Sequence, residues 1–199
     1  RSCRQVDIEP IEGESGFTIG RSESQGTALS QVTADIATCG ECLAELRDLN
    51  DFRYRYPFIN CTNCGPRYSI VRAIPYDRPN TTMSAFAMCR RCAAQYHDVT
   101  DRRFHAQPVA CPQCGPNIRL TDATGGTLRT GTDEAITETA ELLRAGRIIA
   151  IKGIGGFHLA CNALDDGAVL RLRQRKRREH KPFAMMAASV DDVRKYAVV

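Results

Sequence analysis

The stretch Cys39-Gly40-Glu41-Cys42, followed by Cys61-Thr62-Asn63-Cys64, returns fifty residues later as Cys89-Arg90-Arg91-Cys92 and Cys111-Pro112-Gln113-Cys114. Each half has the pattern C-x2-C-x18-C-x2-C. Cysteine pairs with this spacing are typical of metal sites, because one tight turn can present both sulfurs to the same ion. The pattern therefore predicts two four-cysteine metal sites.

The match between the two halves extends beyond the cysteines. Residues near the ligands recur fifty positions later: Asp51, Arg53 and Cys64-Gly65-Pro66 return as Asp101, Arg103 and Cys114-Gly115-Pro116. Tyr54 returns as Phe104. Such similarity at a fixed period indicates a duplicated structural unit.

Zinc is the metal that four thiolates favour, since they give a closed, redox-silent tetrahedral site with no open position for substrate. We expect two structural zinc ions. Iron–sulfur ligation and redox dithiols use similar spacing and are the alternatives. Ligation within each unit is favoured, but spacing alone also allows an interleaved arrangement. His97 and His105 lie near the second set, but are expected to be surface or packing residues because four cysteines are already present.

Between its two cysteine pairs, the first unit has a predicted short helix over Leu43–Leu49 and then the aromatic run from Arg53 to Phe58. We expect these aromatic side chains to cover the metal site. A module of this size has almost no apolar core of its own. Metal binding would supply its folding energy, on the order of 10 kcal/mol or more.

The composition is ordinary for a soluble globular protein, with 43% hydrophobic and 25% charged residues among 199. No apolar run approaches the roughly 18 to 20 residues that span a bilayer, so no membrane association is expected. Eight of ten cysteines fall in metal-type pairs, which predicts a reducing, cytoplasmic location. Cys3 and Cys161 are interpreted as small buried hydrophobes. The net charge of +4 is concentrated between Arg171 and Arg178, which disfavours a general nucleic-acid coat.

The flanking segments differ in character. Residues 1–31 are predicted to form a strand and a polar linker, and Thr121–Thr132 a second linker rich in Gly, Thr and Asp. After it, a helix capped by Thr132 or Asp133 is expected to end at Gly146. The order of elements then indicates an α/β domain. Its expected strands are Arg147–Lys152, Phe157–Cys161 and Phe183–Ala187, and its expected helices are Asp165–Arg178 and one beginning at Ser189.

Two features of this domain suit anion binding. The glycine turn after Lys152, which includes Gly155 and Gly156, lets backbone N–H groups approach an anion, although a plain turn is an equal alternative. The basic run from Arg171 to Lys181 provides fixed positive charge of the kind that phosphate binding requires, although a solvated helix face is the default interpretation from composition.

Several motifs together resemble the HypF hydrogenase maturation carbamoyltransferases. Beside the double cysteine pattern, the segments that carry the resemblance are Arg53–Cys61, Arg102–Pro108, Ala150–Cys161, Arg175–Arg178 and Lys181–Ala184. The resemblance implies an α+β fold with two small tandem four-cysteine zinc-finger modules, followed by the beginning of a YrdC-like α/β domain. The implied boundaries are 1–31 for the tail of an acylphosphatase-like domain and a linker, 32–70 and 71–120 for the zinc modules, 121–132 for a linker, and 133–199 for the N-terminal part of the YrdC-like domain.

The same resemblance implies the activity. A full-length enzyme of this kind would hydrolyse carbamoyl phosphate, adenylate the resulting carbamate with ATP and Mg to carbamoyl-AMP, and pass the carbamoyl group to the C-terminal cysteine of HypE, as a precursor of the cyanide ligand of nickel-iron hydrogenase. The Lys-x-Arg of YrdC-like domains matches Lys176 and Arg178. With Lys181 nearby, and with Lys152, Gly155 and Gly156, these residues would bind the ATP phosphates.

No catalytic residue is assigned within these 199 residues, and we expect the chain alone not to turn over substrate. Two alternatives lie outside catalysis. One is a zinc-finger module that binds nucleic acid, which the spacing disfavours because it is not that of the fingers with two cysteines and two histidines and offers no base-reading helix. The other is a module that docks a partner such as HypE.

Overall fold

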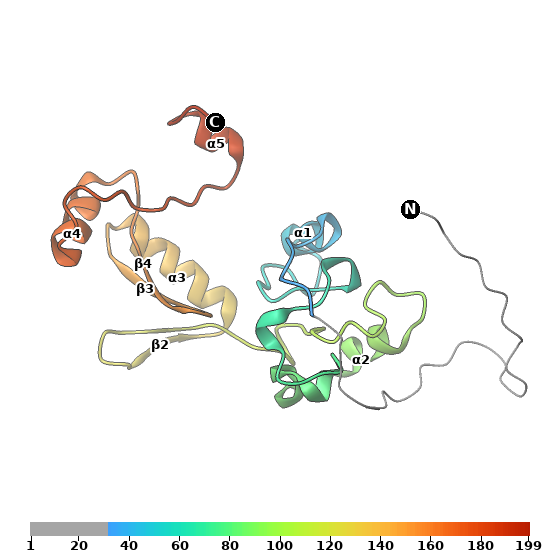
Figure 1. Cartoon of the computed structure of the whole chain (residues 1–199). Helices are drawn as coiled ribbons and strands as arrows, with labels where there is room; N and C mark the ends of the chain where they lie inside the picture. The colour runs from blue at the N-terminus through green and yellow to red at the C-terminus, as the bar shows by residue number, and fades with distance from the viewer. Residues whose placement is uncertain (1–31) are drawn as a thin grey trace, which may run out of the picture.

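The computed structural model describes residues 32–199, so the strand and linker expected within residues 1–31 lie outside the described residues. The cysteine repeats form one lobe, and the helices and hairpins that follow form a second (Figure 1). The first lobe contains two α-helices and four short 3-10 turns, which are α1 (Gly40–Arg47), η1 (Thr62–Cys64), η2 (Tyr68–Ile70), η3 (Arg78–Asn80), η4 (Thr82–Ala85) and α2 (Arg90–His97). The second contains β1 (Arg119–Thr121), β2 (Thr127–Thr130), α3 (Thr132–Arg144), β3 (Ile149–Gly153), β4 (Gly156–Ala160), α4 (Asp166–Lys176) and α5 (Val190–Arg194).

The duplication holds at the level of hydrogen bonds. In the first repeat (residues 39–64), Arg55 N donates to Leu46 O at 2.8 Å, and in the second repeat (residues 89–114), His105 N donates to Tyr96 O at 3.0 Å. Arg55 and His105 also share a left-handed backbone, with φ of 55° and 51°. The two repeats therefore fold in the same way after their first helix.

Both helices of the repeats begin at a cysteine. Cys39 is the N-cap of α1 and its sulfur accepts a hydrogen bond from Cys42 N at 3.5 Å, while Cys89 is the N-cap of α2. The expected helix at Leu43–Leu49 thus starts three residues earlier, because the first Cys-x-x-Cys turn is itself the first turn of the helix.

The two apolar cores of this lobe exchange residues between the repeats. The core of the first repeat includes Tyr56, Ile59 and Met83, together with Ala110 from the second repeat. The core of the second repeat includes Val109, and Phe52 from the first repeat packs against it. Neither repeat encloses its cysteines with its own residues alone.

The connection between the repeats is held by a buried arginine. Arg78 is 8% exposed, and its guanidinium donates to Gln107 O and Val109 O at 2.8 Å each and to Phe86 O at 2.8 Å. One cationic side chain thereby satisfies three carbonyls of the loops that enclose the second repeat.

The second lobe departs from expectation at three places. The segment 121–132, expected to be a linker, forms the turn and second strand of the β1–β2 hairpin, which packs against α3. The N-cap of α3 is Gly131, not Thr132 or Asp133; the Thr132 hydroxyl instead accepts from Ile118 N and donates to Asn117 Oδ1. The expected strand at Phe183–Ala187 is wrong, because no neighbouring strand supplies its hydrogen bonds among the described residues.

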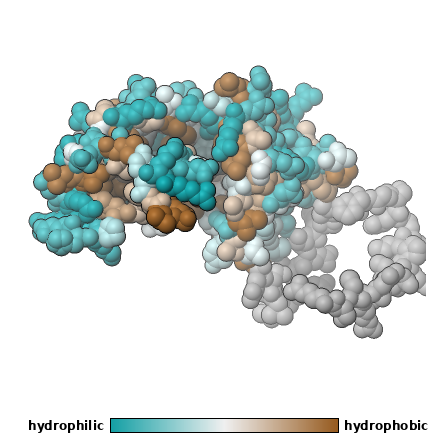
Figure 2. Space-filling model, turned by 90° about the horizontal axis from the view of Figure 1, so that it is seen from above, coloured by the Kyte–Doolittle hydropathy of each residue, from teal (hydrophilic) through white to brown (hydrophobic). Residues whose placement is uncertain are grey.

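Other expectations for this lobe are confirmed. Strands β3 and β4 pair antiparallel from Ile149 opposite Ala160 to Gly153 opposite Gly156. Helix α3 stops before Gly146, which has φ of +74°, and Ser189 caps α5 by accepting a hydrogen bond from Asp192 N at 3.1 Å. The β3–β4 hairpin leaves Ile151, Phe157 and Leu159 43 to 70% exposed, and hydrophobic patches interrupt a mainly hydrophilic surface in Figure 2.

The role of Arg78 can be tested directly. Replacing it (Arg78→Ala) leaves three carbonyls without their donor, so the free energy of unfolding is expected to fall by about 2 to 4 kcal/mol. Arg72→Ala is the matched control, since the Arg72 side chain is exposed and makes one long hydrogen bond, to Ser84 Oγ at 3.5 Å. Urea denaturation under reducing conditions measures both variants, and equal effects would contradict this role.

Candidate metal centres and nucleotide-binding surface

The eight paired cysteines converge into two clusters. Cys39, Cys42, Cys61 and Cys64 form the first, and Cys89, Cys92, Cys111 and Cys114 form the second, with the four sulfurs of each cluster within 4.8 Å of one another. Each cluster draws on one repeat, so the ligand sets are not interleaved. His97 and His105 pack around the Tyr96 ring, at centroid distances of 5.2 and 4.8 Å, as the sequence predicted for packing residues.

The spacing of the sulfurs fits a tetrahedral thiolate site. Cys39 and Cys61 sulfurs lie 3.6 Å apart, Cys89 and Cys111 3.8 Å, and Cys111 and Cys114 3.7 Å. Four sulfurs at about 2.3 Å from a central zinc ion would be about 3.8 Å apart. A disulfide would bring two of them to about 2.05 Å. The donor set and its spacing therefore fit a zinc ion in each cluster.

A glycine follows the second cysteine pair of each cluster, and the two positions require glycine for different reasons. Gly65 has φ of +71°, a conformation that side-chain-bearing residues rarely adopt. At Gly115 a Cβ would lie 2.2 Å from the Tyr56 hydroxyl, which donates to Pro116 O at 3.1 Å. Of the three aromatic residues in the 53–58 run, Tyr56 is fully buried in the core of the first cluster, Tyr54 is half-buried and Phe58 is 41% exposed.

The electrostatic surroundings differ among the thiols. Burial raises the pKa of Cys42 and of Cys92, while a hydrogen bond from Arg102 and the charge of Arg53 respectively oppose the rise. Burial also acts to raise the pKa of Cys64, but backbone hydrogen bonds, including one from Cys39 N at 3.3 Å, outweigh it and lower the pKa to about 7. Each cluster has one such acidic thiol, Cys89 being the other, also with a pKa of about 7.

Arginines from each repeat reach the thiols of the other, which the sequence pattern did not predict. Arg53, which is fully buried, donates from Nη2 to the Cys92 sulfur at 3.3 Å. Arg102 donates from Nη1 to the Cys42 sulfur at 2.9 Å. The recurrence of Arg53 as Arg103 was the available signal, but a repeat in sequence does not say which copy a side chain contacts.

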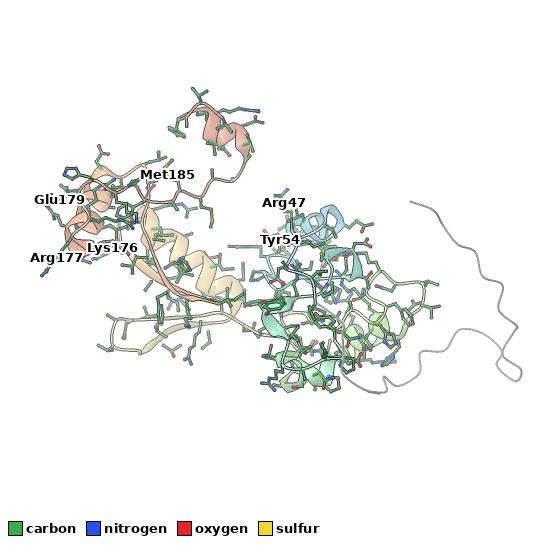
Figure 3. The ribbon with its side chains drawn as sticks, viewed as in Figure 1. Arg47, Tyr54, Lys176, Arg177, Glu179 and Met185 are labelled. Carbon is green, nitrogen blue, oxygen red and sulfur yellow. The ribbon has the colours of Figure 1, made fainter. Side chains whose placement is uncertain are left out.

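The residues expected to bind ATP lie on the second lobe. Lys152 is exposed on β3, with its ammonium 5.2 Å from the Phe157 ring. Gly155 lies in the turn of the β3–β4 hairpin, and Gly156 is the first residue of β4. Lys176 is the last residue of α4, and with Arg177 it lies at one end of the lobe, far from Arg47 and Tyr54 in Figure 3. Within residues 32–199, no hydrogen bond or ion pair joins Lys152 to the basic run.

The basic run is shaped by an arginine that the sequence did not single out. Arg173 donates from Nη1 to Arg178 O at 3.2 Å, Glu179 O at 3.4 Å and Lys181 O at 3.2 Å, which folds the chain back over the end of α4. The Phe183 ring lies under Arg173 and Arg178, at 4.9 and 5.6 Å. Lys176 and Lys181 remain exposed, while Arg178 is half-buried.

Fold and site together define a protein with tandem four-cysteine fingers joined to a YrdC-like domain. Family models match accordingly: the HypF finger model covers residues 38–71 and 88–121, and the Sua5/YciO/YrdC model, described as telomere recombination, covers residues 141–199. The match at 38–71 and 88–121 falls on the two cysteine clusters.

The chain belongs to the HypF family. It is 53% identical to carbamoyltransferase HypF of Synechocystis sp. over 188 residues, covering 94% of this chain and 24% of that protein. It is 54% identical to the probable carbamoyltransferase HypF of Methanocaldococcus jannaschii, covering 92% and 24%. The chain therefore spans about a quarter of the length of these curated relatives.

Two solved structures of HypF proteins also match this chain. A crystal structure of full-length HypF in a phosphate- and nucleotide-bound form matches with a TM-score of 0.73 and 54% identity, over 84% of this chain and 22% of that one. The crystal structure of T. kodakarensis HypF matches with a TM-score of 0.78 and 49% identity over the same shares. None of the helices within residues 32–199 has the length and apolar character needed to cross a bilayer.

The cysteine assignment predicts a metal content. The wild-type chain is expected to bind two zinc ions, and Cys42→Ser one, because three thiolates no longer close the first site. Cys161→Ser is the matched control and should retain two, since Cys161 belongs to neither cluster. Native mass spectrometry under reducing conditions gives the count, and loss of metal from Cys161→Ser would contradict the assignment.

Proposed function

We propose that this chain is the finger and nucleotide-binding part of a HypF-type carbamoyltransferase. The observation that supports this best is the identity of about one half with named HypF carbamoyltransferases over more than 90% of the chain. In this proposal the complete protein uses carbamoyl phosphate and ATP with Mg, forms carbamoyl-AMP, and transfers the carbamoyl group to the C-terminal cysteine of HypE. The proposed location is the reducing cytoplasm, where unpaired thiols persist.

The fingers have a structural role in this proposal. Each would hold one zinc ion through four cysteines, which leaves no position for substrate, so the metal supplies folding energy and no chemistry. The ion pair between Arg55 and Asp133, at 2.8 Å, connects the first finger to the start of α3. This ion pair links the metal-organised lobe to the lobe that carries the basic run.

The basic run would act on the ATP phosphates. In the adenylation step a carbamate oxygen attacks the α-phosphorus of ATP and pyrophosphate leaves, so negative charge develops on the phosphoryl oxygens and on the leaving group. Lys176 and Lys181, both exposed, and Arg178 offer cations to that charge. Arg173 would position them, because it holds the carbonyls of residues 178, 179 and 181. Lys152, Gly155 and Gly156 would contribute from the hairpin.

The nucleotide-binding proposal is tested in the full-length protein. Lys176→Gln with Arg178→Gln should lower carbamoyl phosphate-dependent ATP–pyrophosphate exchange by roughly a hundredfold or more, because two cations that stabilise the transition state are lost. Release of phosphate from carbamoyl phosphate should be unaffected, since that step precedes adenylation.

Arg177→Asn is the matched control for this experiment. Arg177 lies between the two positions with its side chain exposed and its backbone at φ of 49°, which asparagine tolerates. Its exchange rate should stay near that of the wild type. A double variant with full exchange activity would refute the assignment of Lys176 and Arg178.

A further inference from the structure

We propose that the two metal centres bind zinc cooperatively, through a reciprocal exchange of arginines between the repeats. The inference rests on the proposal that each cluster binds zinc. Its basis is the set of contacts made by Arg53, Arg102 and Arg103, here called the arginine exchange.

The exchange is symmetric under the fifty-residue repeat. Arg53 donates from Nε to Ala110 O at 2.8 Å and from Nη2 to Gln95 Oε1 at 2.7 Å. Arg103 donates from Nε to Asn60 O at 3.2 Å and from its Nη atoms to the Glu45 carboxylate. Every partner in one set lies fifty residues from its counterpart in the other. Each arginine crosses to the opposite repeat, which makes the pattern reciprocal.

These contacts lie next to metal ligands. Ala110 and Asn60 directly precede Cys111 and Cys61, and Arg53 itself donates to the Cys92 sulfur. Arg102 extends the second set by donating to the Cys42 sulfur and pairing with Glu45. Arg53 and Arg103 are at most 1% exposed, so water does not screen them. Each arginine is fixed by its own repeat: Asp51 accepts from Arg53 N, and Asp101 from Arg103 N, at 2.7 Å each.

The two centres also have the same net charge once the exchanged arginines are counted. A zinc ion with four thiolates carries two negative charges, which are costly to bury without nearby cations. The first site receives Arg102 and Arg103 and adds the carboxylate of Glu45, whereas the second site receives Arg53 and has the neutral Gln95 at the matching position. Glu45 is charged at neutral pH: burial acts to raise its pKa, but hydrogen bonds from Arg103 and Arg102 outweigh this and lower it. The exchanged side chains therefore leave one net negative charge at each centre.

Cooperativity follows from this geometry. A repeat without metal loses the turns that fix its arginine, because metal binding supplies its folding energy. The opposite site then loses the cation and the N–H···S hydrogen bond that stabilise its thiolates. Loading of one centre therefore raises the affinity of the other, and the coupling is equal in both directions, as linkage requires.

Native mass spectrometry of the 199-residue chain tests this when metal-free protein is half-saturated with zinc. Two independent sites leave one half or more of the chains with a single ion, whether or not their affinities are equal. Between two sites of equal intrinsic affinity, a tenfold coupling, within the usual range of roughly 5- to 150-fold, lowers that fraction to about one quarter. We expect the wild-type fraction to lie well below one half.

The variants assign the coupling to the arginines. Arg53→Lys with Arg103→Lys keeps the charges but loses the forked donors, and should return the singly loaded fraction to one half or more. Arg47→Gln is the control and should behave as the wild type, because Arg47 is exposed on α1 and takes no part in the exchange (Figure 3).

The outcomes separate the two proposals. A wild-type fraction that is no lower than that of the double lysine variant refutes coupling through Arg53 and Arg103 while leaving the two zinc sites intact. A low fraction that persists in the double lysine variant refutes the role of Arg53 and Arg103. A chain that binds no zinc refutes the metal proposal and this inference together.

Discussion

Four thiols brought within 4.8 Å of one another, twice, are the constraint on which the rest of this chain depends. The cores around them are small: four buried apolar residues besides cysteine support the first cluster and two support the second. Burying that much apolar surface cannot offset the conformational entropy of ordering about eighty residues of mostly irregular backbone. Both clusters fit a tetrahedral metal site. Metal binding in such modules contributes on the order of 10 kcal/mol or more to the free energy of folding, which would offset this entropy cost.

The arrangement around the clusters shows why the unit occurs as a pair. Tyr56 and Phe52 belong to the first repeat in sequence, yet Tyr56 packs on Gly115 and Phe52 packs in the core of the second repeat. Ala110 fills the core of the first repeat in return. A single copy would expose these surfaces and leave the backbone carbonyls of residues 60 and 110 without their donors. Duplication and mutual burial are thus one structural solution, in which each finger completes the other.

The sequence predicted the parts of this fold that are local. Cysteine spacing identified both clusters, and Gly146 and Ser189 marked a helix end and a helix start, because turns and caps depend on neighbouring residues. It failed where partners are distant. The strand expected at Phe183–Ala187 has the right composition but no neighbouring strand to pair with among the described residues. Thr132 was expected to cap a helix, whereas its hydroxyl forms hydrogen bonds with Asn117 and Ile118. The arginine exchange was beyond prediction for the same reason, since it joins residues 39 to 60 positions apart.

The same distinction applies to the two candidate sites. The finger ligands lie on short turns that present sulfur to one point, so their sequence pattern determines the geometry almost completely. The basic run has no such internal geometry: Lys176 and Lys181 are exposed, and the loop between them is fixed by the three carbonyl contacts of Arg173. A cationic surface of this kind takes its specificity from how its charges are positioned, because a phosphate can be bound by any nearby cation. In the proposed function, Arg173 is therefore the residue that positions the charge of the basic run for phosphate, through its contacts to these carbonyls.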